Sequence, residues 1–176
     1  GAVAKIDGAG TLVSSDGDIA VTADDLSAIR AEVVATSLAL SASANADSLS
    51  VAVAVSYARN TLRSFVDASI TNSGSDANPV SATAGEIHVV ANKAGSIDAQ
   101  SKAAAVGVAV SASGSAPAVS VGGAVAINRL FGATSAYVES SELEADSVLI
   151  DANSSSVINA EVLAAAVSVA ISPGKS

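Results

Sequence analysis

The sequence LSVAVAVSY, at residues 49–57, decides the fold. Larger apolar residues alternate with small ones along it, so Val51, Val53 and Val55 point to one side of an extended chain and Ala52 and Ala54 to the other. Residues 103–111, AAAVGVAVS, repeat this alternation. Alanine is the best helix former, and the alanine-rich stretch 162–166 invites a helical interpretation. The period of two instead predicts strands, and therefore an all-β protein.

Small residues dominate the whole chain. Its 176 residues include 40 alanines, 30 serines and 24 valines, with no Cys, Met or Trp. A solvated strand face would carry charged residues and threonine, whereas here Ala, Gly and Ser stand opposite Val. Small side chains let a second layer approach more closely than the roughly 10 Å usual between sheets. We therefore expect both faces to be covered. The valine side should face the module's own core, and the alanine side either another sheet of the same chain or another subunit.

Internal repeats indicate how the strands are organised. Three segments align without a gap: residues 18–23 (DIAVTA), 86–91 (EIHVVA) and 147–152 (SVLIDA). Each is followed at matching positions by an isoleucine and an alanine and then by an alternating stretch. The spacing of the three copies falls in the range of large solenoid modules.

A second element extends this alignment. Residues 49–57 match 119–127, residues 65–69 match 137–141, and the opening GAVA at 1–4 repeats 123–126. These matches predict approximate repeats at 1–48, 49–118 and 119–176. Between Ile70 and Gly85 the second copy carries an additional loop, residues 71–80, whose Gly, Asn, Asp, Ser and Pro are typical of a surface turn.

Charge and composition exclude several classes of protein. The net charge of −9, with only eight Lys and Arg, argues against nucleic-acid binding. The longest weakly polar run, residues 162–170, is too short to span a bilayer. No stretch resembles a signal peptide, and the lack of Cys leaves the cell compartment open. Because residue 1 is Gly and no Met occurs, we expect either a processed subunit or a piece of a longer protein.

The repeat resembles modules of very large bacterial surface proteins. The resemblance is to filamentous adhesins of the leukotoxin type and, more loosely, to the filamentous-haemagglutinin class. It rests on residues 123–128 (GAVAIN), 133–141 (ATSAYVESS) and 147–152 (SVLIDA), with 60–67 (NTLRSFVD) as a second copy of the middle stretch. It implies an extended β-solenoid, export to the cell surface and an adhesive or fibre-forming role, and it carries over no catalytic residue.

A search for catalytic and metal-binding patterns gives no site. His88 is the only histidine, so neither a Ser-His-Asp triad nor a multi-histidine metal site can form within one chain. The acids at 16–18 and 24–25 lack the spacing of known calcium loops, and we interpret them as solvated turn residues. Glu142, Glu144 and Asp146 alternate on one strand face, where like charges must be exposed.

Two further features have structural interpretations. The Gly122-Gly123 pair is not followed by the residues of a phosphate loop, so we expect it to mark a close approach of backbones. The four aromatic residues lie at or near the ends of expected strands, and we expect them to plug the ends of a core of small residues. They are Tyr57, Phe65, Phe131 and Tyr137.

We therefore expect a single repetitive all-β domain over residues 1–176, an elongated β-solenoid (β-helix) of about three imperfect repeats of 50–70 residues. A β-sandwich, pilin-like subunit completed by a donated strand such as residues 1–4 is the alternative. The expected function is that of a structural subunit or segment of an extracellular or cell-surface fibre or filamentous adhesin. Such a chain associates with identical chains and needs no catalytic residue, cofactor or metal. A carbohydrate- or partner-binding module, with a surface glycan or protein as receptor, is the alternative.

Overall fold

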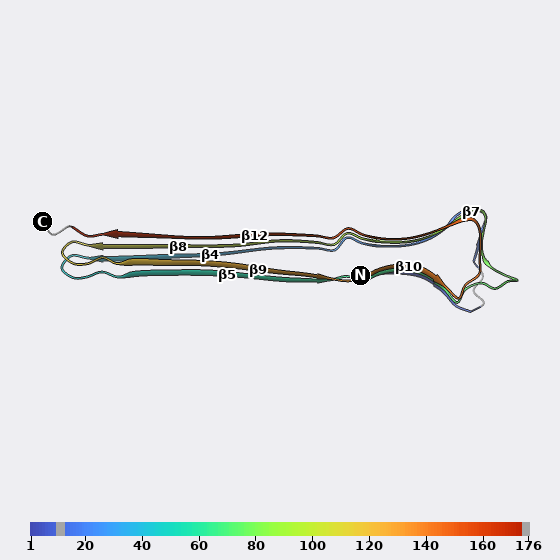
Figure 1. The fold of residues 1–176 in the computed structure, drawn as a ribbon, viewed down its shortest axis with the longest axis horizontal. Helices are drawn as coiled ribbons and strands as arrows, with labels where there is room; N and C mark the ends of the chain where they lie inside the picture. Colours follow the sequence, from blue (N-terminus) through green and yellow to red (C-terminus); the bar gives the residue numbers. More distant parts are fainter. Residues whose placement is uncertain (10–12, 174–176) are drawn as a thin grey trace. The chain divides into compact units, whose positions relative to one another are not determined.

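The chain is all-β, as predicted. A computed structural model describes residues 1–9 and 13–173, and within them twelve strands and no helix are found (Figure 1). The strands are β1 (Ala2–Asp7), β2 (Ser14–Ser15), β3 (Ile19–Asp25), β4 (Ala28–Ser43), β5 (Ser50–Arg63), β6 (Val66–Thr71), β7 (Val80–Lys93), β8 (Ser96–Ser111), β9 (Ala118–Phe131), β10 (Thr134–Glu139), β11 (Leu143–Ser154) and β12 (Val157–Ile171).

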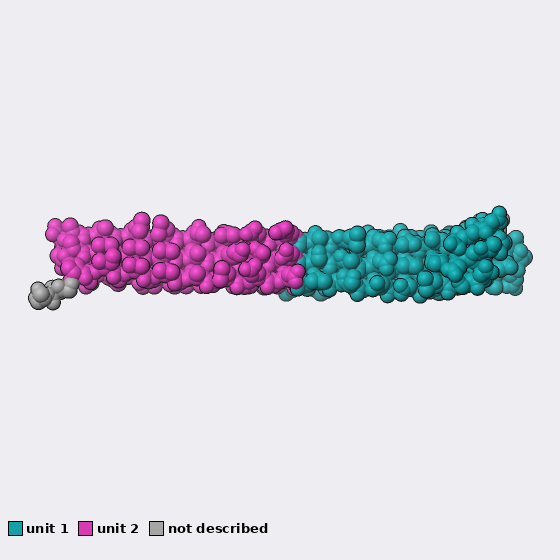
Figure 2. Space-filling view, turned by 90° about the horizontal axis from the view of Figure 1, so that it is seen from above, with its two compact units in different colours: residues 1–29, 61–97, 129–158 teal, residues 30–60, 98–128, 159–176 magenta. Residues whose placement is uncertain are grey.

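The strands belong to two compact units, coloured teal and magenta in Figure 2. Unit 1 consists of Gly1–Ile29, Thr61–Ile97 and Arg129–Ile158, and unit 2 of Arg30–Asn60, Asp98–Asn128 and Asn159–Ser176. Each unit is therefore assembled from three segments that lie far apart in the sequence. This is the organisation expected when successive repeats contribute equivalent strands to the same sheets.

In unit 1 the strands of successive repeats pair in parallel. β6 lies between β1 and β10, and β7 pairs with β2, β3 and β11. Ile87 of β7 has Ile19 of β3 and Val148 of β11 as its Cα partners, so each partner comes from a neighbouring repeat. The alignment of residues 18–23, 86–91 and 147–152 is thus confirmed by the register of the sheet.

The core of unit 1 contains branched aliphatic side chains. Val66, Ala68 and Ile70 of β6 pack in one cluster with Ile87 and Val89 of β7, and all five are almost completely buried. Along β3 the buried residues alternate with exposed ones, so this sheet has one face toward the core and one toward solvent. Unit 1 therefore follows the ordinary pattern of a half-buried strand.

Unit 2 reverses the expected faces. β4, β8 and β12 form one sheet and β5 and β9 a second. Ala52 and Ala54 of β5 pack against Ala103 and Ala105 of β8, and all four are buried. Val51, Val53 and Val55 are 54%, 56% and 64% exposed. The prediction that the valine side faces the module's core is wrong here, and the close neighbour on the alanine side is another sheet of the same chain.

Serine explains why the alanine side is the buried one. The same side of β5 carries Ser50 and Ser56, which are also buried. A buried hydroxyl is costly unless it is hydrogen-bonded, and a short side chain reaches a partner only when the opposite sheet is close. Ser50 Oγ donates to Ala39 O at 2.9 Å, and the Ser56 and Ser101 hydroxyls are 2.9 Å apart. Valine on this side would hold the sheets too far apart for these bonds.

Three of the proposed alignments have a different register. Val66 pairs with Thr134, so residues 65–69 do not pair with residues 137–141 as proposed. Ala2 pairs with Val66, so residues 1–4 do not stack on residues 123–126. Ser50 N donates to Pro117 O, which places β5 two residues away from the proposed match with 119–127. An even shift keeps every side chain on its own face, so an Ala–Val–Ser sequence fits several registers almost equally well.

The insertion predicted at residues 71–80 is present. Eight residues separate Thr71 from Val80, whereas three separate their Cα partners, Glu139 and Leu143. Ser75 and Asn78 exchange two backbone hydrogen bonds of 2.9 Å within the loop, and Gly74 between β6 and β7 has a φ of 74°. The second repeat thus forms its extra turn without disturbing the strands on either side.

Candidate functional site

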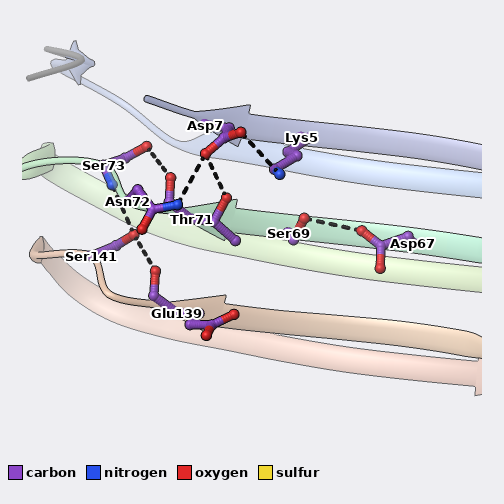
Figure 3. Close-up of polar contacts among 9 residues, drawn as sticks. All are labelled: Lys5, Asp7, Asp67, Ser69, Thr71, Asn72, Ser73, Glu139 and Ser141. Atoms are coloured by element: carbon purple, nitrogen blue, oxygen red, sulfur yellow. Dashed lines mark hydrogen bonds and ion pairs between the residues drawn. The ribbon is translucent and has the colours of Figure 1, made fainter. Parts of the chain in front are cut away.

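The most extensive polar contacts of unit 1 are rows of side chains that hydrogen-bond one repeat to the next, which we call polar ladders. Figure 3 shows one of them at the ends of β1, β6 and β10. The Asp7 carboxylate accepts hydrogen bonds from Thr71 Oγ1 at 2.9 Å and from Asn72 Nδ2 at 3.3 Å, and Lys5 Nζ lies 3.0 Å from its second oxygen. Lys5, then Thr71 and Asn72, lower the pKa of Asp7 below its usual value. The carboxylate of the first repeat thus binds the turn of the second.

The same turn also binds the third repeat. Asn72 N donates to Glu139 O at 3.0 Å. Ser73 N donates to Ser141 Oγ at 3.1 Å (Figure 3). Asn72 and Ser140 both have positive φ angles, of 50° and 49°. Asparagine tolerates this left-handed conformation better than most residues, because its amide can hydrogen-bond locally. The second and third repeats therefore leave their sheet through similar turns that bond to each other.

A second ladder is buried in unit 1. Asp25, at the end of β3, is 8% exposed, and its carboxylate accepts hydrogen bonds from the hydroxyls of Ser27 and Ser64 and from Ser27 N. These bonds, with that from the Ser27 hydroxyl the strongest, lower the pKa of Asp25 despite its burial. Its Cα partner on β7 is Lys93, which is 4% exposed. A buried acid and a buried base thus occupy equivalent positions in adjacent repeats.

Close contact between the sheets characterises unit 2. A Cβ atom added to Gly122 of β9 would lie 2.5 Å from Ala165 O of β12, and one added to Gly107 of β8 would lie 2.8 Å from Ser120 Oγ. Ser120 Oγ itself donates to Val167 O at 2.7 Å. The predicted close approach of backbones is confirmed at Gly122. Its neighbour Gly123 faces the other way, where the nearest side-chain atom would be 3.9 Å from an added Cβ.

Many apolar side chains are exposed on the outer surface of both sheets of unit 2. On β4, Leu38 and Leu40 are 66% and 71% exposed. On β9, Val119, Val121 and Val125 are also exposed, as are the valines of β5. Exposed single apolar residues are normal in proteins, whereas contiguous apolar patches mark sites of interaction.

Of the residues considered for catalysis and metal binding, Asp18 and Asp24 take part in ladders between repeats, and His88 contacts an acid on its own strand. His88 Nε2 lies 2.8 Å from Glu86 Oε2 on the exposed side of β7, and its Cα partners are Ala20 and Leu149. Asp18 Oδ1 accepts from Glu86 N at 2.9 Å, and Asp24 Oδ1 from Asn92 Nδ2 at 2.8 Å. Asp18 and Asp24 are thus acceptors between strands as well as solvated groups. The interpretation as a solvated turn residue is wrong for Asp25, which is buried at the end of β3 because serine donors satisfy its carboxylate. Over residues 1–9 and 13–173 no group of three or more His, Cys, Asp or Glu is placed to hold a metal ion.

The remaining sequence predictions give a mixed result. Glu142, Glu144 and Asp146 are exposed, as predicted. The aromatic residues do not plug a core: Tyr57, Phe65 and Phe131 are 54%, 61% and 48% exposed. Tyr57 lies on the outward side of an alternating strand, and Phe65 lies between β5 and β6. The Arg63 guanidinium lies 5.8 Å from the centre of the Phe131 ring.

The sequence search missed the ladders, although a signal for them was present. Asn60 Nδ2 donates to Asn128 Oδ1 at 2.9 Å, and Asp24 bonds to Asn92; both pairs are 68 residues apart. Asn and Asp at this offset would have fixed the register where the Ala–Val pattern could not.

Among the described residues no helix is long and apolar enough to cross a membrane. No protein-family model, curated protein or solved structure matches the chain.

Proposed function

We propose that the chain is a structural segment of an extracellular or cell-surface fibre or filamentous adhesin, built as a β-solenoid in which each repeat forms one coil. The observation that carries the proposal is the register of unit 1, in which each strand pairs in parallel with its counterpart one repeat away. A coil that passes through both sheets and returns to stack on itself gives this pairing. Such a stack needs no catalytic residue to serve as a fibre.

The third repeat supports stacking beyond the three coils of this chain. Ile87 and Val89 of β7 are completely buried, while the side chains at the equivalent positions of β11, Val148 and Ile150, are 46% and 47% exposed. A further coil of the same kind, in the same polypeptide or in a second copy, would bury them. β11 also offers the unpaired backbone groups of an edge strand, which bind another strand readily.

The donated-strand alternative has less support. It requires the segment at residues 1–4 to be available to a neighbouring subunit. β1 instead pairs in parallel with β6 along its whole length, and Ala2 and Ala4 pack against the core of unit 1. The glycan-binding alternative has no regular row of exposed aromatic residues to support it, because the whole sequence contains only two Tyr and two Phe.

Electron microscopy and fibre diffraction of the purified chain test the proposal. We expect concentration-dependent filaments with a reflection near about 4.7–4.8 Å along the axis. The double variant Val148→Lys/Ile150→Lys should abolish them, because it places two charges where the next coil must pack. Leu149→Lys is the matched control, since Leu149 lies between these residues and points to the opposite face. A wild-type chain that stays monomeric at every concentration, or filaments that persist in the double variant, would refute the proposal.

A further inference from the structure

One sheet of unit 2 carries an outward apolar surface that no other described part of the chain covers. Ser96 N donates to Ser27 O and Ala112 N to Ser43 O, which sets the register of β8 against β4. Val157 N donates to Gly95 O, which sets the register of β12 against β8. The last three outward residues of each strand, at its C-terminal end, then form three adjacent rows. We name this surface the leucine–valine face; it consists of Leu38, Leu40, Ala42, Val106, Val108, Val110, Val167, Val169 and Ile171.

The chemistry of the leucine–valine face limits what it can bind. Its nine side chains include no hydrogen-bonding group, no charge and no aromatic ring. A glycan or a polar receptor would require such groups to fix its orientation. A lipid surface would favour Trp, Tyr, Lys and Arg at its edge, and the chain is acidic, with a net charge of −9. Two copies of an acidic chain, in contrast, avoid most of their mutual repulsion when they meet at an uncharged surface.

The geometry of the face suits a second copy. Two such faces have the same spacing of strands and the same two-residue period, so side chains of one can pack between those of the other, as in aligned sheet packing. The leucine–valine face has an area of roughly 300 Å², because neighbouring strands lie about 4.8 Å apart and alternate residues along a strand about 6.7 Å apart. A stable interface takes about 800 Å² from each partner, so a single pair of faces gives only weak association.

We infer that the leucine–valine face pairs side by side with the same face of a second copy of the chain, and that this pairing strengthens with every coil added to a stack. The inference rests on the proposed function, because the stacked coils supply the area. Each coil adds roughly 100 Å², so about eight coils on each side reach the area of a stable interface. Lateral pairing is then weak between single chains and strong between filaments.

Charge-swapped variants test this pairing. Leu38→Lys/Val169→Lys and Leu38→Glu/Val169→Glu each place two like charges on the outer strands of the face. Both sites are exposed, so the fold should survive, and far-UV circular dichroism checks this. The matched control is Thr22→Lys/Ser147→Lys, with the same charge change at exposed positions of β3 and β11 in unit 1.

Sedimentation equilibrium gives a readout that does not need filaments. All proteins are measured in the Val148→Lys/Ile150→Lys background, in which stacking is blocked. We expect a weak dimer, strengthened by ammonium sulfate, for this background and for the control. Each charged variant alone should lose at least about tenfold in association constant, and an equimolar mixture of the Lys and Glu variants should recover it. Recovery on mixing identifies face-to-face pairing, because only then does each Lys meet a Glu.

Three results would overturn the inference. They are a background protein that forms no dimer, charged variants that associate as strongly as the control, and a mixture that recovers nothing. In a further outcome, the wild-type chain forms no filaments while mixing the Lys and Glu variants still restores association. In that case the stacking proposal fails, but pairing through the leucine–valine face is supported. In wild-type filaments the same variants should abolish paired filaments while leaving single ones.

Discussion

The two adjacent glycines of β9 allow a sharp test of the close contact between the sheets of unit 2. In Gly122→Ala the new Cβ would lie 2.5 Å from Ala165 O, well inside the 3.4 Å at which ordinary contacts begin. The obstacle is a backbone atom, so rotating a side chain cannot relieve it. Overpacking of this kind costs about 1–3 kcal/mol.

Gly123→Ala provides the control within the same strand. Its new Cβ would meet only Val55 Cγ2, at 3.9 Å. Replacing glycine by alanine where the backbone conformation suits both stabilises a protein by about 0.4–1 kcal/mol, because the unfolded chain loses freedom. The two single variants should therefore differ by about 1.4–4 kcal/mol in the free energy of unfolding, with opposite signs relative to wild type.

Urea unfolding followed by far-UV circular dichroism measures this difference, since the chain has no Trp and only two Tyr. Both variants are made in the Val148→Lys/Ile150→Lys background, so that the proposed stacking is blocked during the measurement. Equal stabilities for the two variants, or a destabilised Gly123→Ala, would refute the view that the inner side of β9 is in contact with the opposite sheet and the outer side is free.

Three further predictions concern groups inside the units. Removing one hydroxyl of the buried Ser56–Ser101 pair should cost about 1–2 kcal/mol, and removing both should cost less than the sum of the single changes, as a double-mutant cycle in urea will measure. The pKa of Asp25 is lowered from 3.8, so its ionised form stabilises the fold above about pH 4, and this contribution is lost as the pH falls through the lowered pKa. The difference in free energy of unfolding between wild type and Asp25→Asn should therefore shrink from pH 7 to pH 3. A difference that stays constant over this range would contradict the assignment. Ile87→Ala in the core of unit 1 should cost about 2–5 kcal/mol in thermal or urea unfolding, whereas Val53→Ala on the outer face of β5 should change stability by less than about 1 kcal/mol.

Alternation and repetition in the sequence were enough to predict strands and the register of the β3–β7–β11 sheet. The segments 18–23, 86–91 and 147–152 contain Ile, Leu, Val, His and Asp in distinctive positions, so they fit one alignment best. Residues 49–57 and 119–127 contain almost only Val, Ala, Gly and Ser, so shifts of two residues leave the pattern intact. Polar pairs such as Asn60 and Asn128 fix the register there.

Which face is buried could not be predicted from side-chain size. Burial of a large apolar residue gains more free energy than burial of alanine, so the valine side of β5 was expected to be inside. The deciding groups are Ser50 and Ser56, whose hydroxyls need acceptors in the opposite sheet. Serine scattered among alanines therefore carries more information about orientation than the valines do. The ladders of Asp7 and Asp25 depend on contacts between repeats, which no single segment reveals.

The long separation between paired residues has a consequence for how the chain folds. Every parallel pair in unit 1 joins residues that lie a whole repeat apart. Closing a loop of this length costs about 3.7 kcal/mol before any ladder bond is gained. As the polypeptide emerges from the ribosome, β1 can pair with β6 only once Val66 has appeared, and β3 can pair with β7 only once Ile87 has appeared. Folding should therefore be slow and advance from one repeat to the next, each folded repeat serving as template for the one that follows it. A nascent segment of Ala, Ser and single Val residues, poor in aromatics, is well suited to this delay because it exposes little bulky surface to aggregate while it waits.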